Sequence, residues 1–256
     1  GYDTKQTDPS FVLNRISHSK SRLVAPKGGV SFIDDIAARL AGSYAQRLRA
    51  MNAVDFDDLI ALPVWILKTN TEAAHAWSRK FREILVDEYQ DTNWAQLQLL
   101  KLLSKHHRRV CAVGDDDQSI YAWRGAEASN ILQFDRHFEG AEMIALTQNY
   151  RSTNLILKAA NAVIKNNTVR HEKTLWSSLG DGEKPTFRLF EHGDDEGQWV
   201  ANDVRRKIKN DRISPNQIAI LYRTNAQSRI FEESLVYQQI PFQLVGGTRF
   251  YDRKEV

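Results

Sequence analysis

The sequence predicts an α/β protein whose parallel sheets are flanked by helices, and two features of the chain lead to this class. Short runs of Val, Ile and Leu end abruptly in acidic residues at 84–88 and at 110–115. Such continuous apolar runs are typical of strands buried on both faces of a parallel sheet. In the last third, apolar runs and helical stripes alternate, as in right-handed parallel crossovers. There we expect strands at 186–190, 218–222 and 242–245, and helices at 196–209 and 227–238.

The rest of the chain adds helices and one further strand. A helix is expected near residues 9–21, and Ser31 is placed to cap another that runs to about Met51. The stretch 54–60 opens a helix with acidic residues in its first turn, where the helix dipole favours them, so we assign Asp57 and Asp58 a structural role. We also expect a strand at 143–146 and helices at 94–105 and from Ser152 or Thr153 to about Asn166.

Composition allows one large domain or two small ones. The 256 residues are 42% apolar and 26% charged, which suits packed cores under a charged surface. The net charge of +3 gives no overall basic field, so any contact with nucleic acid must be local. No apolar run approaches membrane-spanning length and the first ten residues are polar, so we expect neither a membrane partner nor a signal peptide.

The single cysteine, Cys111, lies in an apolar strand pattern. We expect a small buried side chain rather than a nucleophile or metal ligand, and one cysteine cannot form a disulfide within the chain. A reducing, cytoplasmic compartment is the default that follows. The chain begins with Gly and stops at RKEV, so we expect an internal piece of a longer protein.

The two acidic strand ends are candidates for a nucleotide-hydrolysing site, because α/β proteins place ligands at this edge of the sheet. Asp87 can hold a phosphate-bound Mg²⁺, an ion that prefers oxygen ligands. Glu88 could orient or deprotonate the water that attacks a γ-phosphate, and Gln118 could sense that phosphate without adding charge. An ordinary solvated turn is the alternative for an Asp-Glu pair alone, and the second acidic strand end followed by Gln118 argues against it.

An aromatic cluster follows Gln118 directly. Single-stranded nucleic acid is bound by stacking bases on aromatic faces and by cations near the backbone. Tyr121 and Trp123 supply such faces, and Arg124 is assigned to support the loop that carries them. The alternative is that Trp123 packs in the core.

Three motifs resemble superfamily 1 DNA helicases of the UvrD/Rep/PcrA family. They are DEYQDTN at 87–93, GDDDQSIYAWRGA at 114–126 and LTQNYRST at 146–153. The resemblance covers nearly the whole chain. It implies an incomplete RecA-like P-loop NTPase fold, ATP and Mg²⁺ as cofactors, and single-stranded DNA and duplex junctions as partners. The implied activity is 3′-to-5′ movement on single-stranded DNA with duplex unwinding, in DNA repair or replication.

The resemblance also implies roles for residues further along the chain. Arg151 would be an arginine finger that reaches the γ-phosphate, and Tyr150 would stack on the adenine. An ordinary surface arginine before a helix is the alternative for Arg151. Arg223 and Arg229, in YRTNAQSR at 222–229, either touch the DNA backbone or support the start of a helix.

On this basis we expect four segments. Residues 1–53 belong to a helical accessory subdomain, 54–147 to the C-terminal part of a first RecA-like motor domain, 148–248 to the N-terminal part of a second, and 249–256 to a truncated helical insertion. No Gly-Lys pair occurs, and a phosphate loop of the form G-x-x-x-x-G-K-[ST] requires one. We therefore expect the chain alone to hydrolyse ATP poorly or not at all. The alternatives are a non-hydrolysing nucleic-acid-binding module and a piece of a helicase-nuclease.

Overall fold

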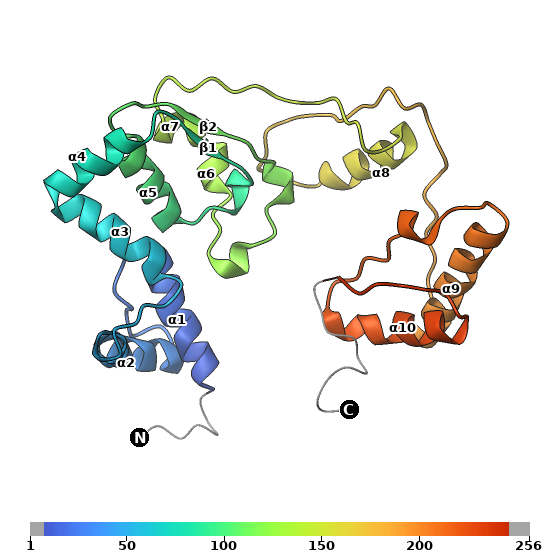
Figure 1. Cartoon of the computed structure of the whole chain (residues 1–256), viewed down its shortest axis with the longest axis horizontal. Helices are drawn as coiled ribbons and strands as arrows, with labels where there is room; N and C mark the ends of the chain where they lie inside the picture. Colours follow the sequence, from blue (N-terminus) through green and yellow to red (C-terminus); the bar gives the residue numbers. More distant parts are fainter. Residues whose placement is uncertain (1–7, 246–256) are drawn as a thin grey trace. The chain divides into compact units, whose positions relative to one another are not determined.

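The computed structural model describes residues 8–245. It separates into two compact units, Gly1–Lys184 and Pro185–Val256 (Figure 1). The first unit contains helices α1 to α8 and a small parallel sheet, and the second contains α9 and α10. Among residues 8–245, no helix combines the length and apolar character that a membrane span requires.

The chain opens with two helices that form their own small core. α1 (Pro9–Ser21) begins after Asp8, whose side chain accepts a hydrogen bond from Ser10 N, and α2 (Phe32–Ala50) begins after Ser31, whose side chain accepts one from Asp34 N. Such side chains satisfy the free N–H groups of a first helical turn. The apolar faces of the two helices meet at Val12, Ile16, Ile36 and Ala37. Both predicted helices are confirmed.

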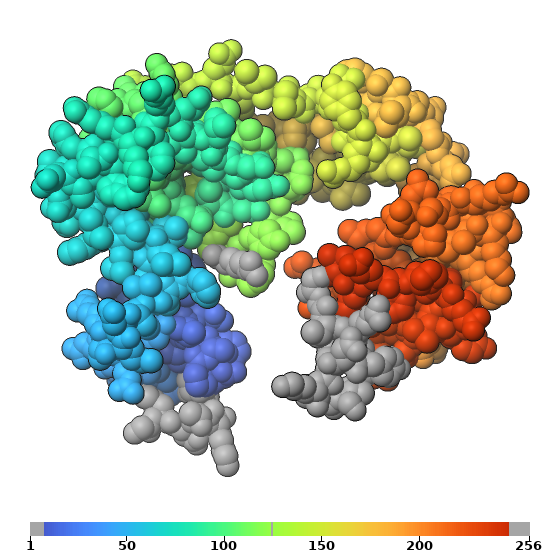
Figure 2. Space-filling model, in the orientation of Figure 1, coloured from blue at the N-terminus to red at the C-terminus, as the bar shows by residue number. Residues whose placement is uncertain are grey.

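Two further helices follow this pair along the chain, and their surfaces continue from those of α1 and α2 in Figure 2. They are α3 (Asp58–Thr69) and α4 (Thr71–Lys80), and both pack on α5 (Trp94–Ser104). α4 was not predicted. Lys20 on α1 forms ion pairs at the start of α3, with its Nζ 2.6 Å from Asp55 Oδ2 and 2.7 Å from Asp58 Oδ1.

The sheet confirms the parallel pairing that the two apolar runs predicted. β1 (Ile84–Val86) pairs with β2 (Val110–Ala112), and α5 forms the crossover between them. α5 starts at a capping box in which Asn93 and Gln96 satisfy each other's backbone N–H. One face of the sheet packs on a core of Tyr89, Leu97 and Leu100.

The prediction that these strands are buried on both faces is wrong. Side chains alternate across a strand, so Leu85 and Cys111, which are paired in register, lie on the face away from Tyr89. Leu85 is 73% exposed and Cys111 is exposed as well, because no described element covers this face. The expectation of a buried Cys111 is therefore also wrong.

The four other expected strands, at 143–146, 186–190, 218–222 and 242–245, form no strand ladder among the described residues. A strand is defined by backbone hydrogen bonds to a neighbouring strand, and these segments form no such ladder among the described residues. Some of their apolar side chains pack on helices instead. Ile218, Ile220 and Phe242 pack on the core between α9 and α10. Phe187 and Leu221 point outward and are 88% and 89% exposed.

The second unit is a helical pair with these extended segments laid along it. α9 (Gly193–Lys209) and α10 (Ser228–Tyr237) share a core of Ala201, Val204, Leu235 and Ile240, and their surfaces are in close contact in Figure 2. A Cβ at Gly197 would lie 2.5 Å from Ile230 Cγ2, so glycine permits this close approach of the two helices. Both helices were predicted, and the insertion expected at 249–256 lies outside the described residues.

The remaining helices belong to the first unit. α6 (Ser129–Leu132) and α7 (Phe134–His137) are short and follow the aromatic cluster. α8 (Asn154–Ile164) begins after Thr153 and confirms the helix expected there. Between α7 and α8 the chain is extended, and an isolated parallel bridge joins Gln148 to Trp176.

Candidate functional site

The acidic pair that follows β1 lies at the carboxyl edge of the sheet with both side chains exposed. The ladder continues just past the strands, because Val113 N donates to Val86 O at 2.8 Å and Tyr89 N donates to Val113 O at 3.0 Å. Glu88 adopts the left-handed conformation (φ 48°, ψ 42°), and its N–H donates to Asp87 Oδ1 at 2.9 Å. A non-glycine residue in this region marks a backbone held by its surroundings.

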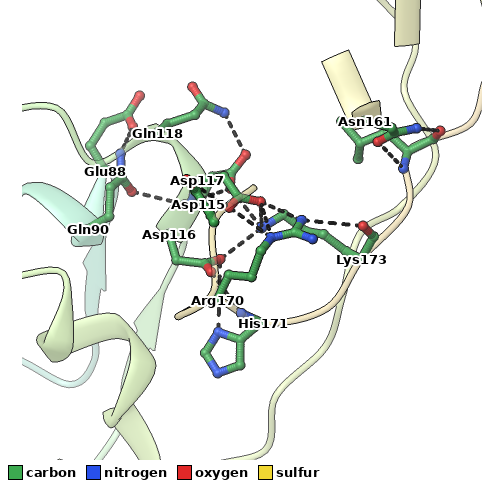
Figure 3. Close-up of polar contacts among 12 residues, drawn as sticks. Glu88, Gln90, Asp115, Asp116, Asp117, Gln118, Asn161, Arg170, His171 and Lys173 are labelled. Atoms are coloured by element: carbon green, nitrogen blue, oxygen red, sulfur yellow. Dashed lines mark hydrogen bonds and ion pairs between the residues drawn. The ribbon is translucent and has the colours of Figure 1, made fainter. Parts of the chain in front are cut away.

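Gln90 connects the two strand ends. Its buried side chain donates from Nε2 to Glu88 Oε2 at 2.7 Å, and its Oε1 accepts from Asp115 N at 3.0 Å (Figure 3). A Cβ at Gly114 would lie 2.6 Å from that same Oε1, so glycine leaves room for the bridge. Gln90 was missed by the sequence analysis, and the signal was its place two residues after Glu88.

The acidic residues after β2 are held by two cations from far along the chain (Figure 3). Lys173 Nζ lies 2.8 Å from Asp115 Oδ1, 2.8 Å from Asp116 Oδ1 and 3.0 Å from Asp117 Oδ2. Arg170 donates to both carboxylate oxygens of Asp117, from Nε at 2.9 Å and from Nη2 at 2.6 Å. The sequence analysis missed both cations, although three successive like charges signal a need for counter-charges.

These contacts change the acidity of the groups. Burial by itself would raise the pKa of Asp115, but hydrogen bonds from Lys173 and Gln118 outweigh it and lower that pKa. For Asp117, burial is likewise outweighed by hydrogen bonds from Arg170 and Lys173, and its pKa is lowered. Burial opposes the charge on Lys173, yet its three carboxylate partners raise the Lys173 pKa above its ordinary range. All three groups are therefore charged at neutral pH.

The two strand ends differ in their suitability for a metal ion. Carboxylate oxygens of Asp115, Asp116 and Asp117 lie within 4.8 Å of one another, but Lys173 and Arg170 already bring two positive charges to them. Asp87 is exposed and has no ion pair with any described residue. Because Mg²⁺ keeps several waters and needs only one or two carboxylates from a protein, Asp87 fits this ion better than the three aspartates do.

Gln118 and the aromatic cluster follow the three aspartates on one continuous segment. The exposed Gln118 donates from Nε2 to Asp115 Oδ2 at 2.7 Å. The rings of Tyr121 and Trp123 lie 6.3 Å apart at 49°. Trp123 is 69% exposed, so the alternative that it packs in the core is wrong. The side chain of Arg124 lies outside the described part of the structure.

Tyr150 and Arg151, which were expected to contact the adenine and the γ-phosphate, are both exposed. Tyr150 is 76% exposed, and its hydroxyl donates to Gln148 Oε1 at 3.0 Å. Arg151 N donates to Asn149 Oδ1 at 3.0 Å, while its guanidinium makes no ion pair with residues 8–245. Within that range, no hydrogen bond or ion pair joins Arg151 to Asp87 or Glu88.

Arg223 and Arg229 belong to the second unit. Arg223 N donates to Gln227 Oε1 at 3.0 Å, just before α10. On α10, Arg229 forms an ion pair with Glu233 at 2.7 Å, one helical turn away. These contacts support the start of α10, and both arginines are exposed.

A cavity of about 390 Å³ opens beside the acidic pair. Its volume lies in the range of small-ligand sites. It is lined by Val86, Asp87, Glu88, Tyr89, Asp91, Thr92, Gln96, Leu99, Leu100 and Leu103. The acidic pair thus stands at the rim of a hollow between β1 and α5.

Comparison with known proteins gives two family matches in tandem. The UvrD/REP helicase N-terminal domain matches residues 2–139, and the UvrD-like helicase C-terminal domain matches residues 144–256. The chain is 43% identical over 258 residues to the ATP-dependent DNA helicase PcrA of Bacillus subtilis (strain 168), covering 99% of this chain and 35% of that protein.

Two further relatives show similar identity and coverage. The ATP-dependent DNA helicase UvrD1 of Mycobacterium bovis is 42% identical over 270 residues, which cover 100% of this chain and 35% of that protein. PcrA of Staphylococcus aureus (strain Mu50) is 42% identical over 258 residues, with 99% and 35% covered. The chain therefore spans about a third of the length of these relatives.

Proposed function

Since the chain belongs to the UvrD/REP helicase family, we propose that it is the central part of an ATP-dependent DNA helicase. The observation that carries the proposal is the exposed Asp87–Glu88 pair, joined through Gln90 to the segment that bears Gln118. The whole motor would be cytoplasmic, would move 3′-to-5′ on single-stranded DNA, and would open duplex junctions in repair or replication. The domain boundaries expected from the sequence belong to this proposal.

Glu88 is proposed as the catalytic base. Gln90 Nε2 donates to Glu88 Oε2 at 2.7 Å, which orients the carboxylate and leaves its other oxygen for the attacking water. Asp87 would hold Mg²⁺, which offsets the negative charge of the phosphates. Gln118 would contact the γ-phosphate through the amide that now donates to Asp115.

The other wall of the nucleotide site is proposed to come from the segment before α8. The exposed ring of Tyr150 is available to stack on adenine. Arg151, whose guanidinium has no ion pair among the described residues, would donate to the γ-phosphate as an arginine finger. Domain closure would bring this wall to Glu88.

DNA contact is proposed at the aromatic cluster. Trp123 and Tyr121 offer faces on which unpaired bases stack, and each stacked base contributes about 1–3 kcal/mol in comparable proteins. Arg124 would support this loop. For Arg223 and Arg229, contact with the DNA backbone is a proposal that stands beside their observed support of α10.

The experiment is ATP hydrolysis with and without single-stranded DNA, by this chain and by a longer protein that contains it. We expect DNA to stimulate the longer protein and the chain alone to be silent. Trp123→Ala should abolish most of the stimulation and keep the basal rate. Trp65→Ala, which removes another tryptophan that is 62% exposed, is the matched control.

A longer protein that binds single-stranded DNA without hydrolysing ATP would contradict the proposal and support the non-hydrolysing module. Nuclease activity in the longer protein would support the helicase-nuclease. If single-stranded DNA still stimulates the Trp123→Ala variant, the aromatic cluster does not contact DNA as proposed.

A further inference from the structure

Residues 170–177, which none of the proposed roles uses, are fastened to α8 by two asparagines. Asn161 Nδ2 donates to Leu175 O at 2.9 Å, and Leu175 N donates back to Asn161 Oδ1 at 3.2 Å (Figure 3). Asn154 makes the same reciprocal pair with Ser177, at 2.9 Å in both directions. Each amide thus imitates a strand neighbour for the extended segment. We call residues 170–177 the brace.

The carboxyl end of the brace reaches the segment that carries Tyr150 and Arg151. Trp176 N donates to Thr147 O at 3.2 Å, and Asn149 N donates to Trp176 O at 2.7 Å. Asn149 in turn accepts from the backbone of Arg151 at 3.0 Å through its Oδ1. Asn149 therefore connects the backbone of Arg151 to the backbone of Trp176.

The amino end of the brace reaches Gln118. Lys173 Nζ lies 2.8 Å from Asp115 Oδ1, and Asp115 Oδ2 accepts from Gln118 Nε2 at 2.7 Å. Arg170 donates three hydrogen bonds to Asp117, two from Nε and one from Nη2. The side chains of Lys173 and Asp117 are 15% and 8% exposed, so solvent ions screen these contacts little.

We propose that Lys173 and Arg170 are positioning residues that couple Gln118 to the Tyr150–Arg151 segment through the brace. Two groups fastened to one short segment are biased toward moving together, because the contacts between them are continuous. The inference rests on the proposed function, in which a change at Gln118 on ATP binding would shift Arg151 through these contacts. A purely structural role would stabilise the unit without linking these two positions.

The coupling is tested first in the chain itself by hydrogen exchange. Lys173→Ala should speed exchange of the Gln118 and Arg151 amides at least about tenfold, because it removes the charge-assisted contacts of Lys173 with three aspartates. Lys173→Arg should restore protection. Lys158→Ala, at an exposed lysine of α8, is the matched control, and unchanged exchange in α5, which shares its core with β1 and β2, shows that this part of the unit is folded. Unchanged exchange at Arg151 in Lys173→Ala would overturn the inference.

The second arm is steady-state ATP hydrolysis with single-stranded DNA by a longer protein that contains the chain. Lys173→Ala should lower kcat about 10- to 100-fold with little change in KM, because misplaced catalytic groups slow the reaction itself. Lys173→Arg should recover most of kcat. If kcat of Lys173→Ala stays within about twofold of wild type, the activation barrier is almost unchanged. That result would overturn the catalytic coupling. If the wild-type longer protein hydrolyses no ATP, the proposed function fails, and the exchange arm still decides whether the brace links the two positions.

Discussion

The two parallel strands β1 and β2 end side by side in the same kind of residue, yet the two ends are built in opposite ways. After β1, Asp87 and Glu88 are exposed and have no ion pair among the described residues. After β2, the side chains of Asp115 and Asp117 are 26% and 8% exposed, and Lys173 and Arg170 hold them. The first end keeps its carboxylates available for chemistry, and the second uses them for structure.

What anchors each end differs accordingly. The β1 end is fixed by the fully buried ring of Tyr89, which packs edge-on against Phe134 with ring centroids 5.2 Å apart. The β2 end is fixed by ion pairs to the brace. A similar acidic pattern after two strands therefore does not define a role by itself; the counter-charges that contact the carboxylates distinguish the two ends.

The largest expected effect on stability comes from removing the apolar anchor of β1. Tyr89→Ala should lower the free energy of unfolding of the chain by about 3–5 kcal/mol, the cost of emptying a fully buried aromatic site. Urea denaturation measures it. Tyr150→Ala, at a tyrosine that is 76% exposed, should change it by less than about 0.5 kcal/mol. Equal losses in the two variants would show that Tyr89 is no anchor.

A matched pair of carboxylate-to-amide changes compares the two ends directly. Asp117→Asn should lower the free energy of unfolding by about 2 kcal/mol, because the charge-assisted hydrogen bonds from Arg170 weaken. Glu88→Gln should change it by less than about 0.5 kcal/mol, since this side chain is exposed. The same urea denaturation serves for both, and a larger loss in Glu88→Gln would reverse the assignment of the two ends.

Acid should weaken the β2 end. In the folded chain the pKa values of Asp115 and Asp117 lie below their ordinary value of 3.8. The contribution of these carboxylates to folding stability is therefore complete above pH 3.8. It is lost as the pH falls through the lowered values, because the unfolded chain then binds more protons. Unfolding midpoints between pH 5 and pH 2 measure this loss. Asp117→Asn should show a shallower fall than wild type, and parallel falls would contradict the assignment.

The smallest expected effect concerns the Tyr89 hydroxyl. This buried group has no hydrogen-bond partner among the described residues, and burial raises its pKa to about 12. Tyr89→Phe should therefore leave the free energy of unfolding within about 1 kcal/mol of wild type, because an unpaired polar atom is removed. Thermal denaturation at pH 7 checks this, and a loss as large as that of Tyr89→Ala would reveal a missing partner.

Local signals in the sequence predicted the helices well. The cap Ser31 and the helical stripes at 32–51 and 94–105 are each contained in a single stretch of chain, so α2 and α5 form where expected. The strands at 186–190 and 218–222 were predicted wrongly for the converse reason. Their apolar pattern reports burial of a face, while a strand also requires a hydrogen-bonded neighbour elsewhere in the chain.

In the candidate site, too, residues that belong to a local sequence pattern could be predicted and those that contact it from far along the chain could not. Asp87, Glu88 and Gln118 could be chosen because an acidic strand end is a local pattern. Lys173 could not, because 57 residues separate it from Asp116 and no spacing rule links them. The exposure of Leu85 was also unpredictable, because an apolar run does not reveal which of its faces is covered.

The central claim is that the β1 end carries the chemistry, and ATP hydrolysis by a longer protein with Glu88→Gln tests it most directly. The control is Glu83→Gln, which neutralises an exposed carboxylate just before β1. With saturating single-stranded DNA, we predict that Glu88→Gln lowers kcat by about 10²–10⁴-fold, the usual contribution of a general base, and that Glu83→Gln matches wild type. Hydrolysis by Glu88→Gln at the wild-type rate would contradict the account.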